Sequence, residues 1–263
     1  MTTSERSRDR AASALLVLHA CALVAAFFTL AGAFDFPAVL RRPPLEILGR
    51  FRVNEALVRG TYIAFTLTGV SFVLMALAVS EALRERAGPW GRVAAVMGTL
   101  AGLTQAIGFI RWVWLVPALA AMAVDDGASE ARREAAVVVF TALHEFAGVS
   151  VGENLSFLFQ GLWTFAVGVE LRRHLDPRLG AIGMVSGLSF VLYTLEQHGG
   201  PFAALGAWNV PFHVVWVAFL ALLAARLEKR RRRHPDAPLG RRAYALALLG
   251  TGLLFVAVYG GSP

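Results

Sequence analysis

Seven polar side chains lie in or beside long apolar stretches and have the chemistry to bind a ligand or to move a proton. They are Arg111, Glu145, Glu153, Asn154, Gln160, Glu196 and His213. A guanidinium can hold a carboxylate or another anion through two parallel hydrogen bonds, and a carboxylate or imidazole can act as a general acid or base. Charged groups are costly in apolar surroundings, so each marks either a functional site or an ion pair that locks packing.

A polar stripe is predicted on the helix that carries Glu145, Glu153 and Gln160. At about 100° per residue, Glu145, Gly152, Ser156 and Gln160 fall within roughly 80° of each other on one helix, with Glu153 and Thr164 on the flank. We therefore expect this face to be the one that meets the other polar groups.

Arg111 is expected to pair with Glu153 or Glu145. Such a pair would compensate a charge that is otherwise expensive inside a membrane. Three interpretations stay open for it: a structural lock, a small-ligand site used in binding, sensing or transport, and a membrane-embedded enzyme. In the enzyme, Glu153 would be the general acid or base and Arg111 would stabilise developing charge.

No catalytic residue can be assigned from a motif, because the chain has no GxSxG, phosphate-binding-loop or dinucleotide-binding pattern. No cofactor is predicted. Metal or haem binding stays open, since His144, Glu145, His198 and His213 could donate ligands, although no HxxxH or HExxH spacing occurs.

The elements that must position these residues are membrane-spanning helices. The sequence is 57% hydrophobic and only 16% charged, against about 25% charged in soluble proteins, and its mean hydropathy is +0.59. The net charge of +7 comes from arginines clustered between apolar runs, which is how membrane topology is encoded. The partner this indicates is a lipid bilayer, not nucleic acid.

Seven spans are predicted: a six-span core and a C-terminal span. The apolar runs cover residues 11–34, 56–83, 93–120, 147–171, 179–198, 204–227 and 242–260. Each approaches or exceeds the ~20 residues that a helix needs to cross the bilayer, and lipid leaves backbone groups no other hydrogen-bond partners. The fold is therefore expected to be an all-α polytopic bundle forming a single membrane domain over residues 1–263.

The segments between and beside the predicted spans are the loops and the chain ends. We expect a cytoplasmic tail over 1–10, outer loops with interfacial helices over 35–54 and 124–146, and a basic cytoplasmic loop over 228–241. Pro43-Pro44 blocks helix continuation, so a short helix is expected over 45–51, and Ser129 is the expected N-cap of the second loop helix. The first apolar run exceeds the 7–15 residues of a signal peptide's apolar region, so it is expected to stay as a span.

Orientation follows from the arginines. With the N-terminus in the cytoplasm, more than twice as many basic residues face inward as outward, which predicts a C-terminus outside. This threading places Arg111, Glu145, Glu153, Glu196 and His213 in one layer near the outer surface. Gly148 and Gly152 form a small-xxx-small pair that favours a homo-oligomer or another membrane partner.

The chain resembles the bacterial integral membrane family called domain of unknown function 4386. The resemblance rests on Phe36-Pro37, Leu40-Arg41, Gly102 to Gln105, Gly108 to Trp112 with Pro117, and Gly148 to Glu153. It implies a multi-span protein of the bacterial cytoplasmic membrane with no established activity. The seventh span looks like an addition to the family pattern.

Overall fold

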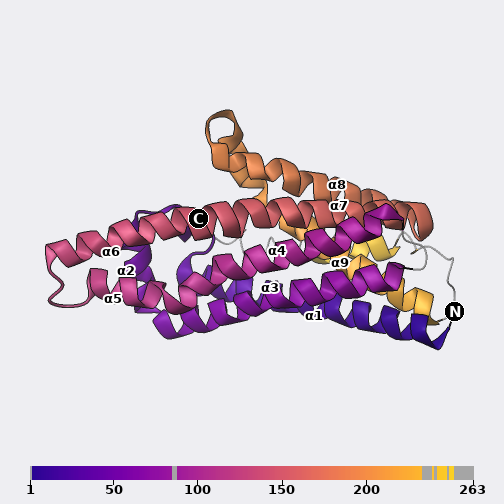
Figure 1. Cartoon of the computed structure of the whole chain (residues 1–263), viewed down its shortest axis with the longest axis horizontal. Helices are drawn as coiled ribbons and strands as arrows, with labels where there is room; N and C mark the ends of the chain where they lie inside the picture. Colours follow the sequence, from indigo (N-terminus) through magenta and orange to yellow (C-terminus); the bar gives the residue numbers. More distant parts are fainter. Residues whose placement is uncertain (1, 85–87, 233–238, 240–241, 248, 252–263) are drawn as a thin grey trace. The chain divides into compact units, whose positions relative to one another are not determined.

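The protein is helical throughout the part described by a computed structural model, which covers residues 2–84, 88–232, 239, 242–247 and 249–251 (Figure 1). No strand occurs among these residues, which confirms the all-α fold. In chain order the elements are α1 (Thr3–Phe34), η1 (Ala38–Arg41), α2 (Pro44–Val53), α3 (Glu55–Leu83), α4 (Pro89–Trp114), α5 (Val116–Val124), α6 (Glu130–Leu143), η2 (His144–Leu155), α7 (Ser156–His174), α8 (Pro177–Tyr193), η3 (Thr194–His198), η4 (Gly200–Trp208) and α9 (Asn209–Arg232).

Six helical runs are long and apolar enough to cross a membrane. They are Thr3–Phe34, Glu55–Leu83, Pro89–Val124, Glu130–His174, Pro177–His198 and Gly200–Arg232. Each contains one of the first six predicted spans, so the polytopic membrane architecture is confirmed. Of the predicted seventh span, residues 242–247 and 249–251 are helical, and residues 248 and 252–260 lie outside the described part.

Helix α3 shows how such a span presents itself to lipid. Its exposed apolar side chains recur three or four residues apart and form one stripe: Ile63, Leu67, Val70, Leu74 and Leu77, between 44% and 59% exposed. A soluble protein would bury a continuous stripe of this kind, whereas a bilayer solvates it. The stripe therefore fits a membrane environment.

The contacts divide the chain into two compact units. Unit 1 contains residues 1–21, 71–102 and 156–263, and unit 2 contains residues 22–70 and 103–155. Each unit has its own packing, and the single-domain organisation stays a prediction.

Unit 2 is built around buried aromatic side chains. Trp112 of α4 stacks on Tyr62 of α3 with ring centroids 4.8 Å apart, and Phe34, Phe51 and Phe140 lie edge-on or tilted around these two rings. All five rings are at most 2% exposed. Large offset and edge-on aromatic contacts of this kind hold the ends of α1, α2, α3, α4 and α6 together.

The two predicted loop helices are present in unit 2. Helix α2 begins with Pro44, whose missing N–H is tolerated at the first helical position. Helix α6 is capped by Ser129, whose side chain accepts from the Arg132 N–H at 3.4 Å. Both expected helices therefore form, and α2 extends a residue before and two residues beyond the expected range of 45–51.

Unit 1 depends on close helix contacts made through glycine. On α7, a Cβ added to Gly168 would lie 2.6 Å from the backbone nitrogen of Met184 on α8, and one added to Gly161 would lie 2.6 Å from the Gly187 carbonyl oxygen. Small residues let the two backbones approach, as is common between helices in membranes. Asp176 then caps α8 by accepting from the Arg178 and Leu179 N–H groups, each at 3.1 Å.

Two predicted boundaries change in the structure. Helix α1 begins at Thr3, so the expected tail over 1–10 is mostly helical. Helix α9 continues to Arg232, so the expected loop over 228–241 begins as helix; residues 233–238, 240 and 241 lie outside the described part. Charged residues have good helix propensity, so the helices extend beyond their apolar runs.

Candidate functional site

Twelve consecutive residues in unit 2, His144–Leu155, form a π-helix between α6 and α7. The Ser150 hydroxyl donates to the Glu145 carbonyl oxygen five residues earlier, at 3.0 Å. π-Helical turns are rare and occur frequently at functional sites. This segment carries several of the predicted polar groups, so it is the strongest candidate for a site in unit 2.

The π-helix changes which side chains share a face. A π-helix advances by roughly 82° per residue, so positions nine apart lie within about 20° of each other, whereas an α-helix would place them opposite. His144 and Glu153 therefore share a face, and His144 is only 7% exposed. Glu145 is exposed to solvent or lipid instead. The stripe predicted at 100° per residue does not hold here.

Arg111 lies against this segment. Its guanidinium packs over Gly148, where an added Cβ would be 2.7 Å from the guanidinium carbon. It donates to the Gly108 carbonyl of its own helix and lies 5.3 Å from the centre of the Trp112 ring. A side chain at position 148 would thus occupy space that the guanidinium uses.

The second glycine of the predicted pair is also used within the chain. A Cβ added to Gly152 would be 2.7 Å from the Cα of Gly108, so the backbones of α4 and the π-helix touch. Close approach of this kind requires glycine at both positions. A partner protein would therefore have to use a face other than the one formed by Gly148 and Gly152.

Glu153 is held by Arg41. The Arg41 Nη2 donates to Glu153 Oε2 at 2.7 Å, and its Nη1 donates to Oε1 at 3.4 Å, which is a two-pronged contact. Arg41 ends η1, the short helix that follows the first span. Among the described residues no carboxylate forms an ion pair with Arg111, so Arg41 takes the place that was predicted for Arg111.

Three buried polar atoms in unit 2, on side chains linked through the rings of Trp112 and Phe140, have no hydrogen-bond partner among the described residues. They are Arg111 Nε, Tyr62 Oη and His144 Nδ1. Tyr62 stacks on the Trp112 ring that Arg111 also contacts, and His144 stacks on Phe140, whose ring lies 6.2 Å from Trp112. Unsatisfied buried polar groups cost about 1–3 kcal/mol each, so such a cluster calls for an explanation.

The tautomer of His144 follows from its other nitrogen. His144 Nε2 lies 3.2 Å from the Leu40 carbonyl oxygen, which can only accept, so Nε2 carries the proton. In the neutral ring Nδ1 is then an acceptor. Leu40 and Arg41 together join η1 to the π-helix through His144 and Glu153.

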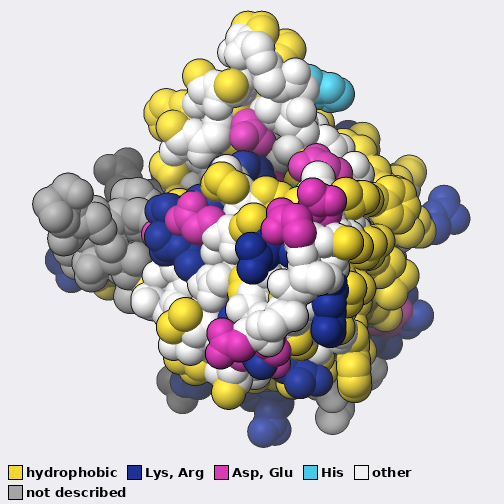
Figure 2. All heavy atoms as spheres, turned by 90° about the vertical axis from the view of Figure 1, so that its left-hand side faces the viewer, with side chains coloured by type: hydrophobic (Ala, Val, Ile, Leu, Met, Phe, Trp, Pro, Cys, Tyr) yellow, Lys and Arg dark blue, Asp and Glu magenta, His cyan; other side chains and the backbone are white. Residues whose placement is uncertain are grey.

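Beside this site, α2 and its flanking loops carry a network of ion pairs. Arg42 bridges Glu46 and Asp35, each at 2.7 Å, and Arg52 binds Asp125 at 2.9 Å. Figure 2 looks onto the end of unit 2 that carries α2, α5 and α6, where basic and acidic side chains are interleaved. The hydrogen bond from Arg42 holds the pKa of the Glu46 carboxyl below its ordinary value.

The remaining predicted residues belong to unit 1. Gln160 of α7 is 4% exposed, and its Nε2 has no partner among the described residues. His213 of α9 has its Nδ1 2.8 Å from the Asn209 carbonyl oxygen and contacts the rings of Phe157 and Phe190. Glu196 lies on η3, and its Oε1 would be 3.4 Å from a Cβ added to Gly206. The single outer layer that joins these residues to Arg111 and Glu153 stays a prediction, as does the role of Asn154.

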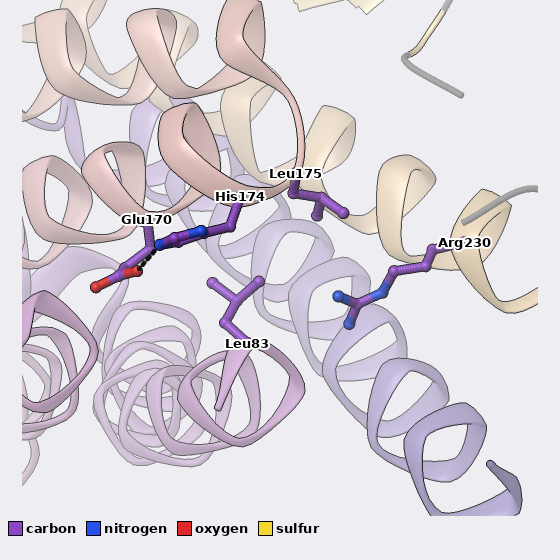
Figure 3. Close-up of a pocket in the computed structure, with 5 residues that line it drawn as sticks. All are labelled: Leu83, Glu170, His174, Leu175 and Arg230. Atoms are coloured by element: carbon purple, nitrogen blue, oxygen red, sulfur yellow. Dashed lines mark ion pairs between the residues drawn. The ribbon is translucent and has the colours of Figure 1, made fainter. Parts of the chain in front are cut away.

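A small cavity in unit 1 is a second candidate. It is lined by Leu83, Glu170, His174, Leu175 and Arg230 (Figure 3). The polar groups on its wall already have partners. Glu170 accepts from the N–H groups of Gly88 and Gly91 at 3.0 and 3.1 Å, and lies 3.6 Å from His174. Arg230 donates to Asp9 and to the Ala82 carbonyl oxygen.

The first residues of the expected basic loop over 228–241 form ion pairs within unit 1. Arg230 is 8% exposed and buried on Asp9, and Arg231 and Arg232 bind Glu228. A buried charge needs a partner, and α1 supplies one from the far end of the sequence. We therefore assign the walls of this cavity to structure.

Sequence reasoning missed Tyr62 and Arg41 as members of the unit 2 site, and it did not predict that His144 is buried there. Tyr62 carries no local signal because aromatic residues are common in spans. The π-helix that buries His144 has no recognised sequence pattern. Among the described residues, no group of three or more His, Cys, Asp or Glu side chains could hold a metal ion.

Comparison with known proteins places the chain in a family. The domain of unknown function (DUF4386) matches residues 11–226, most of the chain, so the protein belongs to this family. The expected family is thereby confirmed. No curated protein and no solved structure matches the chain.

Proposed function

We propose that this membrane protein binds a small ligand at the Arg111 site of unit 2, in a binding, sensing or transport role. The observation that carries the proposal is the set of unpartnered buried atoms, Arg111 Nε, Tyr62 Oη and His144 Nδ1. A polar site that is complete without a ligand satisfies its own donors and acceptors.

The rival interpretation, a structural lock, fits less well. A lock would compensate the Arg111 charge with a carboxylate, and the nearby carboxylate of unit 2, Glu153, is gripped by Arg41 instead. Breaking or forming a buried pair is worth several kcal/mol, so an arginine without one is an expensive packing element. An arginine kept for a ligand accounts for this cost.

The enzyme alternative uses the same residues in another way. Glu153 as general acid or base would have to leave the two-pronged contact with Arg41. No contact among the described residues favours this alternative over binding, so ligand binding is the stronger proposal.

Location and orientation complete the proposal. We place the protein in the bacterial cytoplasmic membrane with its N-terminus in the cytoplasm and its C-terminus outside, because the arginine distribution favours this threading. In this orientation the C-terminal end of α4, which carries Arg111, is directed toward the outer surface, so a ligand would enter from outside.

Complementation of a strain that lacks the gene tests this function. The Arg111→Gln variant keeps much of the side-chain volume but loses the charge, and Arg132→Gln removes an exposed arginine of the same unit as a matched control. We expect the control to restore the wild-type phenotype and Arg111→Gln to fail while reaching the membrane at the wild-type level. Full complementation by folded Arg111→Gln would refute the site.

A further inference from the structure

We infer that the ligand of the Arg111 site is a small anion or an anionic headgroup, held by the guanidinium of Arg111 together with the Tyr62 hydroxyl. This inference rests on the proposed function and names the chemical class of its ligand. Its basis is the charge and the hydrogen-bonding capacity of the side chains around Trp112.

Charge is the first argument. The site contains two guanidiniums, Arg111 and Arg41, and one carboxylate, Glu153, which binds Arg41 at 2.7 Å. These three groups of unit 2 therefore leave one positive charge, and it resides on Arg111. A charge in apolar surroundings is stabilised by an opposite charge brought close to it, so an anion is the ligand that offsets this cost.

Hydrogen-bonding capacity is the second argument. Arginine Nε can only donate, and a tyrosine hydroxyl can donate, so two of the three unpartnered atoms offer hydrogen to a ligand. The two side chains contact the same indole: the Arg111 guanidinium carbon lies 5.3 Å from the Trp112 ring centre, and the Tyr62 ring lies 4.8 Å from it. A carboxylate or phosphate oxygen accepts from both kinds of donor.

The third unpartnered atom, His144 Nδ1, restricts the charge and the hydrogen-bonding groups that the anion can carry. Because Nε2 faces the Leu40 carbonyl oxygen, neutral His144 offers only an acceptor at Nδ1. A hydroxyl carried by the ligand, or a water molecule beside it, would complete this position. The neutral imidazole adds no positive charge to that of Arg111. A ligand with a single negative charge therefore matches the charge of the site.

Binding is tested with the full chain in nanodiscs of neutral phosphatidylcholine. Sodium acetate and inorganic phosphate are titrated at constant sodium concentration, with acetamide as the uncharged analogue of acetate, and the thermal unfolding midpoint is followed. A ligand that binds the folded state raises the midpoint in proportion to the logarithm of its concentration once it saturates the site. We expect the anions to raise it and acetamide to have no effect.

The variants assign the response to Arg111. Equilibrium binding of radiolabelled acetate should weaken about 10- to 100-fold in Arg111→Gln, less in Arg111→Lys, and remain unchanged in Arg132→Gln. If Arg111→Gln does not fold, Arg111→Lys still decides, because it keeps the charge and loses the planar fork of donors. Equal acetate binding by Arg111→Lys and the wild type, with phosphate giving no response, would overturn the inference.

A second arm distinguishes the source of the anionic group. Part of the phosphatidylcholine is replaced by phosphatidylglycerol, and a rise in the midpoint that disappears in Arg111→Lys or Arg111→Gln would assign the group to a lipid headgroup. The absence of a response to acetate, phosphate and phosphatidylglycerol together would overturn the inference.

Failure of the inference and failure of the proposed function are distinguishable. An Arg111-dependent response to acetamide that equals the response to acetate would overturn the inference that the ligand is an anion, and the proposal that the site binds a ligand would stand. Complementation of the deletion strain by folded Arg111→Gln would overturn both.

Discussion

At the scale of residues, the site depends on one arginine and one glycine: the Arg111 guanidinium fills the space that a side chain at position 148 would need. Arg111 brings a permanent charge into α4, and Gly148 lacks the side chain that would displace it. The guanidinium is oriented by the Gly108 carbonyl and by Trp112, which leaves Nε without a partner. A preorganised donor of this kind binds a ligand with little loss of side-chain entropy.

Gly148→Ala tests this packing. The new methyl group would lie 2.7 Å from the Arg111 guanidinium carbon, so the guanidinium must shift. Overpacking of this kind costs about 1–3 kcal/mol of folding free energy, and we expect a lower unfolding midpoint and weaker acetate binding together.

Gly60→Ala is its control, because nothing lies within 4 Å of a Cβ at Gly60 on α3 of the same unit. Alanine is the better helix former by roughly 1 kcal/mol. The midpoint should therefore stay the same or rise. Equal effects of the two substitutions would refute the contact between Gly148 and Arg111.

Exchanging charges identifies the partner of Glu153. Arg41→Glu places two carboxylates together and should lower the unfolding midpoint, and adding Glu153→Arg should restore it. A partly exposed pair is worth up to about 1 kcal/mol, which corresponds to a midpoint shift of roughly 2–4 °C.

The alternative exchange, Arg111→Glu with Glu153→Arg, should not restore stability. A rescue by this second exchange and not by the first would return Glu153 to Arg111, as the sequence alone suggested. The comparison thus separates the pairing observed in the structure from the pairing inferred from composition and depth.

At the scale of elements, the π-helix decides which residues meet. The sequence was sufficient to predict the first six spans, a short helix near residues 45–51 and the cap of α6 at Ser129, because these follow from apolar length and local hydrogen bonding. It was insufficient for His144, Glu145 and Glu153, because their faces depend on an i→i+5 hydrogen-bond pattern that has no recognised sequence signal.

Tyr62 and Arg41 were missed for a different reason. Both reach the site from distant parts of the chain, α3 and η1, through contacts that have no local sequence signal. The same is true of Asp9, which binds Arg230 in unit 1 across 221 residues. Long-range pairing of charges requires the tertiary structure.

Helix α2 should make stability depend on pH in the acidic range. The hydrogen bond from Arg42 lowers the pKa of Glu46 relative to an unfolded chain. A carboxyl whose pKa is lowered on folding contributes stability above its ordinary pKa of about 4.3, and this contribution is lost as pH falls below that value. Thermal midpoints measured between pH 7 and pH 3 should fall at the acid end.

Glu46→Gln removes the titrating group and should flatten part of that fall. Glu130→Gln is a suitable control, because Glu130 is exposed and its nearest arginine, Arg133, is 3.9 Å away. Identical acid profiles for the wild type and Glu46→Gln would show that the Arg42 contact contributes nothing measurable.

At the scale of the whole molecule, the chain is a polytopic membrane protein whose spans could be predicted from hydropathy. Its orientation is a prediction that rests on arginine counts. Such counts predict threading well when loops are short, but they do not report how helices pack against one another. Packing within each unit is instead determined by glycine contacts and aromatic rings that hydropathy does not register.

Cysteine labelling tests the orientation. Cys21 is the only native cysteine, so Cys21→Ala provides a background for Glu196→Cys and Arg232→Cys. In intact cells, a membrane-impermeant maleimide should label position 196 and should reach position 232 only after the membrane is opened. Labelling of both positions from the same side would refute the predicted threading.

The most direct measurement for the account as a whole is an experimental density map of the wild-type protein in nanodiscs with acetate present, compared with Arg111→Lys under the same conditions. The account predicts density that belongs to no protein atom within hydrogen-bond distance of Arg111 Nε and Tyr62 Oη, and weaker density in the variant. A map in which Arg111 Nε instead donates to a carboxylate of the chain itself, with no such density, would contradict it.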